Sequence, residues 1–376
     1  MKIVHLGKYY PPDTGGIESV AASLARGTAS HGHEVDVVSF GRTSSSVLDA
    51  GARVLRHRVA KTVASQPLSA GYVIDAIRRG RRADVLHVHV PNMLAAWAAL
   101  RVGPRPAVVV HWHSDVIDKG LLGRVLGPLE RALLRRADVI ICTSPPYAQA
   151  SPILQPFASK IRVVPIGVPE QDAGTIDEAT VPANLREWIG ARKLVLCIGR
   201  LVPYKGYESL IDAASQVQQD AAIVVVGGGP LAGELQARID RGGLAHRIRL
   251  AGRLDDAALA WLRRRADVFC MPSVERSEAF GVVLIEAMAI GRAVLATDIP
   301  GSGVPWVNLH GASGLNVPPN HPVELSAAMD LLLTDDALRL RLAAGARQRY
   351  EQMFTEAVSV EGTLDVYAGL RASPRA

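Results

Sequence analysis

Short aliphatic runs alternate with helical patterns along the first part of the chain. The runs are KIVHLG, EVDVVSF, DVLHVHV, AVVVHWH and DVIICTS, and segments rich in alanine and leucine with helical spacing separate them. Continuous apolar runs of this length are typical of strands that are buried on both faces of a parallel sheet. The pattern therefore predicts a doubly wound α/β domain.

A second series of the same kind follows, with KLVLCIGR, AAIVVVGGG, RIRLAGR, DVFCMPS and RAVLATD. The stretch between the two series, VPEQDAGTIDEATVPANL, is polar and rich in Pro, Gly, Asp and Thr, which favours a linker. We predict a Rossmann-like domain over 1–170, a linker over 171–190 and a second Rossmann-like domain over 191–354. The two domains are expected to face each other across a deep cleft, and the last helix, about 355–376, to pack back on the first domain.

Length and composition agree with this organisation, because 376 residues exceed the size at which a single core stops growing. No run of about 18 apolar residues occurs, so we expect no membrane-spanning helix. The start, MKIVHLGKYYPP, is expected to form a buried strand rather than a secretory signal, which predicts a cytoplasmic location. Cys142, Cys197 and Cys270 lie in or near apolar runs without C-x2-C spacing, so we expect reduced core thiols.

Positive charge is concentrated in the first domain. Residues 1–170 carry 21 Lys and Arg against 12 Asp and Glu, whereas the remaining residues carry 21 against 24. Much of the surplus lies in Arg78, Arg79, Arg81 and Arg82 and in the leucine-rich stretch 119–138. Two interpretations stay open, a surface for anionic lipid headgroups and an ordinary solvated helix face. A nucleic-acid partner is not expected, because aromatic residues for base stacking are scarce.

The first chemical signal is YYPPDTGGIES, in which Gly15 and Gly16 follow the first strand and precede a helix. Glycines at this place allow the backbone to pass close to a ligand and direct N–H groups at anionic oxygens, although a tight turn also requires them. The stretch lacks the G-x-G-x-x-G and G-K-[ST] patterns, so hydride transfer and phosphoryl transfer from ATP lose support.

Two further turns follow strands of the second domain. IGRLVPYKG places Arg200 and Lys205 directly after a strand, and VVVGGGP places Gly227 and Gly228 at the end of the next one. α/β sheets bind ligands at the carboxyl ends of their strands, so a diphosphate clamp is favoured over two surface charges. The glycines leave room for a ribose or a base.

The stretch ERSEAFGVVLIE carries two carboxylates, Glu278 on a loop and Glu286 inside the helix that follows. Ala279, Phe280, Gly281 and Val282 lead into this helix, whose first N–H groups lack intrahelical acceptors. Solvated charges beside a buried helix are the ordinary alternative. Beside the turn that carries Arg200 and Lys205, a sugar nucleotide fits better. Carboxylates accept hydrogen bonds from the hydroxyls at its two ends, and cations and N–H groups bind its diphosphate.

The combination of GGIES, HWHSD, GRLVPYKG, VVGGGP and E-x7-E followed by AMAIGRAVLATDIPGSG resembles the retaining GT-B glycosyltransferases of family 4, across nearly the whole chain. The resemblance implies that Gly15 and Gly16 approach the diphosphate and that Arg200 and Lys205 neutralise it. It also implies that Glu278 holds hydroxyls of the donor sugar and Glu286 those of the ribose. Substitution of Arg200 or Lys205 is then expected to reduce transfer and leave the fold intact.

The remaining site residues rest on the same resemblance. The base would lie near Arg253 and Leu254, and His113 matches the active-site histidine of the family, with His111 beside it. The candidates for acceptor binding are Tyr10, Asp115 and Ser144. Ile166 stands in PIGV where the family often has an asparagine, so a polar contact is expected to be missing there.

HWHSDVI, TSPPY, VVPIGV and IPGSGVPWVN resemble more closely the bacterial enzymes that build exopolysaccharide or O-antigen units on polyprenyl diphosphate. This implies GDP-mannose as donor, a lipid-linked or soluble glycan as acceptor and peripheral attachment to the inner face of the cytoplasmic membrane. A UDP-sugar, carrying glucose or N-acetylglucosamine, is the alternative donor. The sequence has no D-x-D, so no metal and no cofactor are expected. Two rival functions are a sugar-nucleotide 2-epimerase and a non-catalytic partner that binds a nucleotide.

Overall fold

The computed structural model describes the chain except for residues 14, 64–65, 116–121, 171–179 and 373–376. It divides into two compact units, and each is described by itself. Unit 1 comprises Met1–Val168 and Phe354–Ala376, and unit 2 comprises Pro169–Met353. The C-terminal segment returns to unit 1 through its backbone, since the N–H of Val168 donates to the carbonyl of Phe354 at 2.9 Å.

Unit 1 is built on a mostly parallel sheet in the order β10-β9-β8-β7-β1-β2-β4-β3, in which only the β3–β4 pair among the described strands is antiparallel. Its elements are β1 (Lys2–Leu6), α1 (Gly16–Ser30), β2 (Glu34–Gly41), β3 (Ser45–Asp49), β4 (Ala52–Arg58), β5 (Lys61–Val63), β6 (Gln66–Leu68), α2 (Ala70–Gly80), β7 (Val85–Val90), α3 (Met93–Ala99), β8 (Ala107–Trp112), α4 (Leu122–Arg136), β9 (Val139–Cys142), α5 (Pro145–Ala150), η1 (Gln155–Lys160), β10 (Ile161–Val163) and α14 (Glu356–Ala372).

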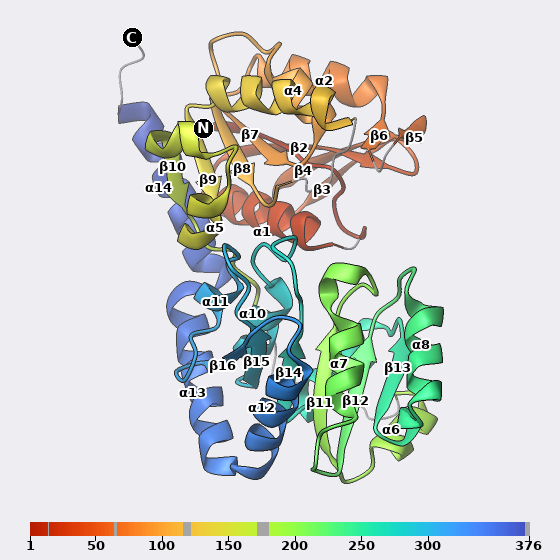
Figure 1. The fold of residues 1–376 in the computed structure, drawn as a ribbon. Helices are drawn as coiled ribbons and strands as arrows, with labels where there is room; N and C mark the ends of the chain where they lie inside the picture. The colour runs from red at the N-terminus through yellow and green to blue at the C-terminus, as the bar shows by residue number, and fades with distance from the viewer. Residues whose placement is uncertain (14, 64–65, 116–121, 171–179, 373–376) are drawn as a thin grey trace. The chain divides into compact units, whose positions relative to one another are not determined.

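Helices cover both faces of this sheet, with α1 on one side and α2 and α4 on the other (Figure 1). On the α1 side, Ile3, Val85 and Val109 of neighbouring strands form a core with Ala22 of α1 and Tyr367 of α14. Both faces of the central strands are buried, as the continuous apolar runs predict.

Unit 2 is built on a parallel sheet in the order β13-β12-β11-β14-β15-β16. Its elements are α6 (Ala183–Ile189), β11 (Lys193–Ile198), η3 (Pro203–Lys205), α7 (Tyr207–Ala214), β12 (Ala221–Val226), α8 (Ala232–Arg241), η4 (Leu244–His246), β13 (Ile248–Gly252), α9 (Asp256–Arg265), β14 (Val268–Met271), α10 (Val282–Ala289), β15 (Ala293–Thr297), α11 (Val304–Val307), β16 (Gly314–Val317), α12 (Pro322–Thr334) and α13 (Asp336–Met353).

The core of unit 2 joins the strands to α7, α8 and α12 on one face, and α9 and α10 contact β11, β14 and β15. Cys197 and Cys270 are buried and reduced in this unit, and Cys142 is buried and reduced in unit 1. The expectation of three reduced core thiols is therefore confirmed.

The predicted linker is wrong over part of its length. Residues 183–189 form α6, which belongs to unit 2 and buries Leu185 and Ile189. Two apolar side chains four positions apart lie on the same face of a helix, and this short signal is outweighed in the sequence by the polar residues before it. Residues 171–179 lie outside the described part of the chain.

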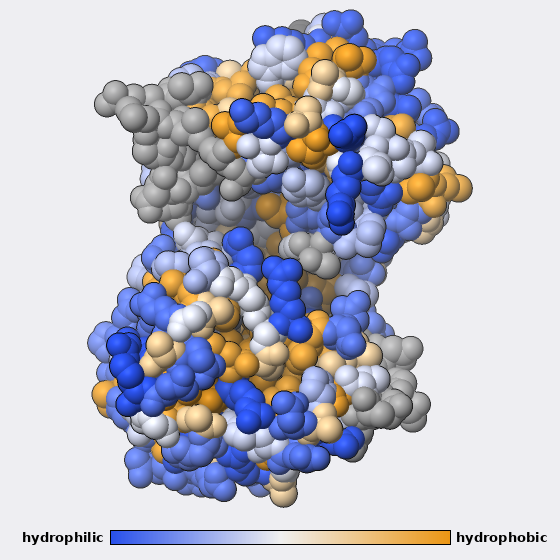
Figure 2. All heavy atoms as spheres, turned by 90° about the vertical axis from the view of Figure 1, so that its right-hand side faces the viewer, coloured by the Kyte–Doolittle hydropathy of each residue, from blue (hydrophilic) through white to orange (hydrophobic). Residues whose placement is uncertain are grey.

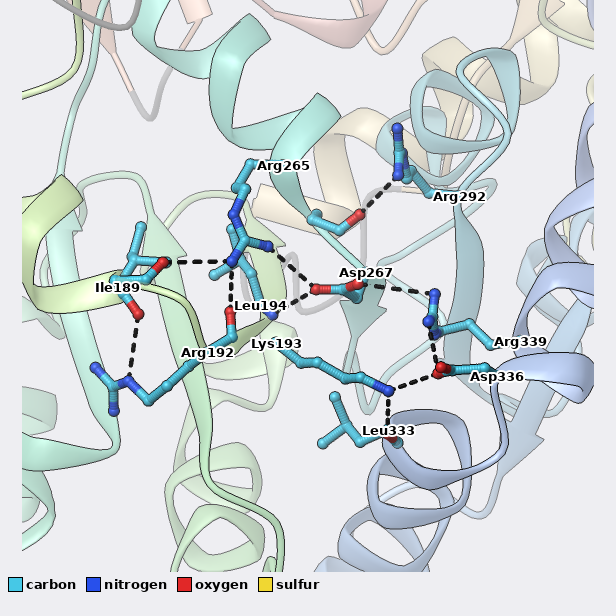
Figure 3. A network of polar contacts seen from close by, with 12 residues as sticks. Ile189, Arg192, Lys193, Leu194, Arg265, Asp267, Arg292, Leu333, Asp336 and Arg339 are labelled. Atoms are coloured by element: carbon cyan, nitrogen blue, oxygen red, sulfur yellow. Dashed lines mark hydrogen bonds and ion pairs between the residues drawn. The ribbon is translucent and has the colours of Figure 1, made fainter.

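Charged residues tie together the amino ends of the strands in unit 2 (Figure 3). The carboxylate of Asp267 accepts from the N–H of Leu194 at 2.9 Å and faces Arg265 at 3.3 Å. Lys193 and Arg339 meet on Asp336, at 2.5 and 2.7 Å. Ion pairs thus stabilise the edge of the sheet at which the strands begin. The turns that carry the predicted site residues lie at the opposite edge, where the strands end.

Hydrophobic and hydrophilic groups are mixed on the surface of unit 1 where β5 and β6 lie (Figure 2). Val63 of β5 and Leu48 of β3 are among the exposed apolar residues of unit 1. Among the described residues, no helix has both the length and the apolar character needed to cross a bilayer.

Candidate functional site

The predicted donor-binding residues of unit 2 lie in four turns that follow β11, β12, β13 and β14. Because the strands are parallel, these turns meet at one edge of the sheet. Backbone hydrogen bonds join them, from Leu201 N to the carbonyl of Gly228 at 3.1 Å and from Gly227 N to the carbonyl of Gly252 at 2.8 Å.

Close approach of these turns explains the glycine run. Gly227 has φ of 147°, and a Cβ built on it would lie 1.8 Å from the carbonyl oxygen of Gly199. A Cβ on Gly229 would lie 2.3 Å from the carbonyl oxygen of Leu201. A side chain fits at neither position, so the run is required for packing whatever it binds. A Cβ on Gly228 would stand 3.1 Å from Nε of Arg253, which places the exposed Arg253 side chain beside this turn.

The central feature is a buried ion pair between Lys205 and Glu278, which are 8% and 9% exposed. The Glu278 carboxylate also accepts a hydrogen bond from Ser273 Oγ at 3.0 Å, and Ser302 Oγ donates to the Glu278 carbonyl. Two residues 73 positions apart are thereby joined at the edge of the sheet.

Lys205 stays protonated in this pair. Burial by itself lowers the pKa of its ammonium group, but the negative charge of Glu278 and the influence of Tyr204 outweigh burial, and the net pKa is raised. The ammonium group is therefore positive throughout the neutral range.

Arg200 differs from Lys205 although the two share one turn. Its side chain is exposed, and it makes no hydrogen bond or ion pair with any other described side chain. An exposed guanidinium keeps its donor fork free for a bidentate anion such as a phosphate.

The helix α10 begins beside this pair, with Gly281 as its N-cap at φ of 82°. A Cβ there would lie 3.0 Å from both Leu284 and Met271. Ala279 and Phe280 are buried, so their side chains pack inward and only their backbone is placed to meet a ligand. Leu254, in the turn after β13, and Val282, the first residue of α10, are half-buried. The N-terminus of α10 therefore offers N–H groups near the ammonium group of Lys205.

Glu286 forms an ion pair with Arg263 of α9, a partner that the sequence analysis missed. Burial raises the pKa of the Glu286 carboxyl, and Arg263 partly opposes this. The Glu286 side chain is 24% exposed. No motif marks Arg263, because its place opposite Glu286 depends on the packing of α9 against the sheet.

His113 belongs to a cluster of five buried histidines in unit 1. These are His5 of β1, His87 and His89 of β7, His111 of β8 and His113 directly after it. Alternate residues share one face of a strand, and β1, β7 and β8 are neighbours, so the five rings stack on one face. The signal was present in the sequence as HVH and HWH, but His5, His87 and His89 were missed as partners of His113.

The histidines are held by hydrogen bonds to one another. His113 Nε2 lies 3.0 Å from His89 Nδ1, and His89 Nε2 lies 3.1 Å from His5 Nδ1. Burial lowers the pKa of each of the five rings, in the case of His5 to about 3. All five are therefore neutral at pH 7.

The other predicted residues of unit 1 are placed as follows. Gly15 and Gly16 are exposed at the start of α1. Tyr10 is buried and its hydroxyl donates to Asp49 at 2.8 Å, so it packs in the core. Its role in acceptor binding stays a prediction.

Asp115 and Ser144 have structural partners within unit 1. Asp115 accepts hydrogen bonds from Trp112 Nε1 and Ser151 Oγ, both at 2.8 Å. Ser144 is buried and caps α5, accepting from the N–H of Tyr147. Ile166, in PIGV, is buried as well.

Comparison with known proteins identifies the family. The family model for glycosyl transferases group 1 matches residues 186–349, and the model for Glycosyltransferase Family 4 matches residues 14–172. O-antigen chain mannosyltransferase C of Escherichia coli is 30% identical, over 99% of this chain and 100% of its own length. The chain belongs to the family 4 glycosyltransferases.

This glycosyltransferase is also 31% identical to D-rhamnosyltransferase WbpZ of Pseudomonas aeruginosa, over 94% of the chain and 92% of the relative. Two solved structures confirm the predicted GT-B class of α/β fold. Sucrose-phosphate synthase from Thermosynechococcus elongatus has a TM-score of 0.76 at 22% identity, covering 99% of this chain and 100% of the other. Anabaena HepE, solved with UDP and glucose, has a TM-score of 0.77 at 20% identity, covering 98% and 100%.

Proposed function

We propose that this glycosyltransferase moves mannose from GDP-mannose, with retention of the anomeric configuration, to a lipid-linked or soluble glycan in the synthesis of a cell-surface polysaccharide. The observation that carries the proposal is the buried pair of Lys205 and Glu278 beside exposed Arg200. The mannosyltransferase name of the Escherichia coli relative supports the sugar. UDP-glucose or UDP-N-acetylglucosamine is the alternative donor.

In this proposal, the diphosphate lies against Arg200, Lys205 and the N-terminus of α10. Fixed positive charge at this place stabilises the negative charge that develops on the leaving nucleoside diphosphate, without solvent reorganisation. The same charges would do the work that a divalent metal does in other transferases, so we propose a metal-independent reaction without a cofactor.

In this proposal, the two carboxylate oxygens of Glu278 have different partners. One oxygen, Oε2, holds Lys205 and Ser273. The other is available for a hydroxyl of the transferred sugar, as a carboxylate accepts several hydrogen bonds. Retention follows if the acceptor hydroxyl attacks from the face that the diphosphate leaves, with a diphosphate oxygen receiving the proton. His113 polarises or orients the sugar in this scheme.

Calorimetric titration with GDP and UDP tests the site, because Glu278 and Glu286 are expected to contact different parts of the sugar nucleotide. Glu286→Gln should weaken GDP binding about tenfold or more, because a charged hydrogen bond to the ribose is lost. Glu278→Gln should leave GDP affinity unchanged or slightly tighter, because Lys205 loses its counter-charge, while transfer falls.

A matched control is Glu234→Gln, an exposed glutamate of α8, which should change neither quantity. Loss of GDP binding by Glu278→Gln under conditions in which it is folded, or unaltered GDP binding by Glu286→Gln, contradicts the assignment. Tighter binding of UDP than of GDP by the native protein selects the alternative donor.

We further propose that unit 1 contacts the inner face of the cytoplasmic membrane through α2, α3 and α4. α3 contacts both of the other helices, and Trp97 of α3 is 37% exposed with the Arg101 guanidinium 3.4 Å above its ring. Arg131 and Arg135 are exposed one turn apart on α4. Arg79 is excluded from this surface, since it is paired with Asp36 at 2.6 Å.

The double variant Arg131→Ser, Arg135→Ser is expected to bind anionic vesicles about thirtyfold more weakly, since each basic residue contributes about 1 kcal/mol. Sedimentation with phosphatidylglycerol vesicles, at rising salt, measures this. Arg241→Ser, Arg341→Ser removes the same charge from exposed positions of unit 2 and serves as control. Equal binding of native protein to anionic and neutral vesicles contradicts the proposal.

A further inference from the structure

Three of the buried histidines form a chain of hydrogen bonds that links their tautomers. His89 joins His5 at 3.1 Å and His113 at 3.0 Å through its two ring nitrogens. A neutral imidazole has one N–H and one lone pair, so fixing the proton on one ring fixes it on the other two. Only two arrangements are possible, with the protons directed from His5 to His113 or from His113 to His5.

The two ends of this chain decide between the arrangements. Nε2 of His5 and Nδ1 of His113 have no hydrogen-bond partner among the described residues, and one of them must carry the proton. A buried N–H without an acceptor is rarer than a buried lone pair without a donor. Both nitrogens are buried, but His5 is 0% exposed in mid-strand, whereas His113 as a whole residue is 6% exposed and follows the carboxyl end of β8, so the His113 end lies nearer the surface.

We propose that His89 is a positioning residue that holds His113 in the Nδ1–H tautomer, so that His113 donates a hydrogen bond from Nδ1 to an oxygen of the bound substrate. His5 Nδ1–H donates to His89 Nε2, and His89 Nδ1–H donates to His113 Nε2. His5 Nε2, at the more deeply buried end of the chain of hydrogen bonds, then carries a lone pair instead of a proton. The inference rests on the proposed function in one respect, the placing of His113 at the substrate.

A metal ion is the competing explanation for this cluster, because nitrogens of His89, His111 and His113 lie within 4.8 Å of one another. The ring geometry argues against it. The ring planes of His111 and His113 are inclined by 9° at a centroid distance of 4.2 Å, and those of His89 and His113 by 12° at 5.3 Å. Imidazole binds a metal through a lone pair in the ring plane, and stacked parallel rings cannot direct three lone pairs at one ion.

A second pair of bonds in the cluster supplies a control. His87 Nδ1 lies 2.5 Å from the Tyr367 hydroxyl, and its Nε2 lies 3.2 Å from His111 Nδ1. His87 is as deeply buried as His89, yet it has no hydrogen bond to His113. His87→Leu therefore disturbs the same stack without touching the bond that sets the tautomer of His113.

Nitrogen-15 NMR of the 376-residue chain labelled at its eleven histidines tests the proposal. The His113 resonances are assigned by their loss in His113→Asn. We expect a protonated Nδ1 and an unprotonated Nε2 for His113 in the native protein and in His89→Asn, whose amide keeps a donor near the Nδ1 position. His89→Leu should shift His113 toward the Nε2–H form, and His87→Leu should not.

Transfer assays provide the second readout. His89→Leu should lower kcat about tenfold, the loss of one hydrogen bond to the substrate, with His89→Asn recovering most of it and His87→Leu staying near the native value. An Nε2–H tautomer of His113 in the native protein overturns the inference, as does a change of the cluster resonances on adding Zn²⁺ alone. If His113→Ala transfers normally, the proposed role of His113 fails instead, whatever its tautomer.

Discussion

Lys205→Met is expected to lower glycosyl transfer about a hundredfold and also to destabilise unit 2, whereas Arg200→Met is expected to lower transfer alone. The loss of transfer reflects a charge contact of roughly 3 kcal/mol to the leaving diphosphate. The stability difference comes from burial. Removing one partner of a buried ion pair leaves the other uncompensated, at a cost of about 3–5 kcal/mol, and Glu278 is that partner. Arg200 is exposed and leaves no such charge behind.

Denaturant unfolding and a transfer assay on the same preparations separate the two effects. Lys205→Met, Glu278→Gln should regain most of the stability, since no buried charge is left, and should remain inactive. Arg241→Met, at an exposed arginine of α8, is the control for both measurements. Native stability and native turnover of Lys205→Met would remove Lys205 from the site.

Unit 1 is expected to lose stability steeply as the pH falls below about 6.5. Burial lowers the pKa of each of the five histidines in the folded chain. Between this lowered pKa and the ordinary pKa of the unfolded chain, the unfolded chain binds more protons than the folded one. The stabilisation is therefore present above the unfolded pKa and is lost as pH falls. Each histidine contributes up to about 1.4 kcal/mol per pH unit, and five together rival the 5–15 kcal/mol of a whole domain within about two units.

Unfolding free energies measured from pH 8 to pH 5 check this. His87→Leu should flatten the dependence by about one proton, because it removes one titrating ring. Thr43→Ala, at an exposed position of unit 1 that does not titrate, should leave the slope as it is. A stability that does not change between pH 8 and pH 5 would show that the cluster is hydrated or already protonated.

The strands β1, β2, β7 to β9 and β11 to β15 could be predicted because each lies in a run rich in aliphatic residues. The strands β3, β4, β10 and β16 were missed, because they are short or partly exposed. The glycine turns and the E-x7-E stretch could be placed because their motifs follow those runs directly. Pairing of side chains could not be predicted, since Lys205 and Glu278 meet across 73 positions through the packing of two turns. That pairing corrects the expectation that substitution of Lys205 leaves the fold intact.

Other misses have the same origin. The partner of Glu286, Arg263, lies on a helix without a motif, and α6 was hidden by the polar stretch before it. The histidine stack needed the strand order as well as the sequence. HVH and HWH alternate visibly, but only the pairing of β7 with β8 and β1 brings His89 between His5 and His113.

The central claim, retaining transfer from GDP-mannose, is tested most directly by proton NMR of GDP-α-mannose incubated with the purified protein. Without an acceptor, water takes the sugar, and the first mannose released reports the stereochemistry. We predict slow release of GDP with α-mannose appearing first, unaffected by a metal chelator and about a hundredfold slower in Lys205→Met. Release of β-mannose first, or no consumption of GDP-mannose while a UDP-sugar is consumed, would contradict the account.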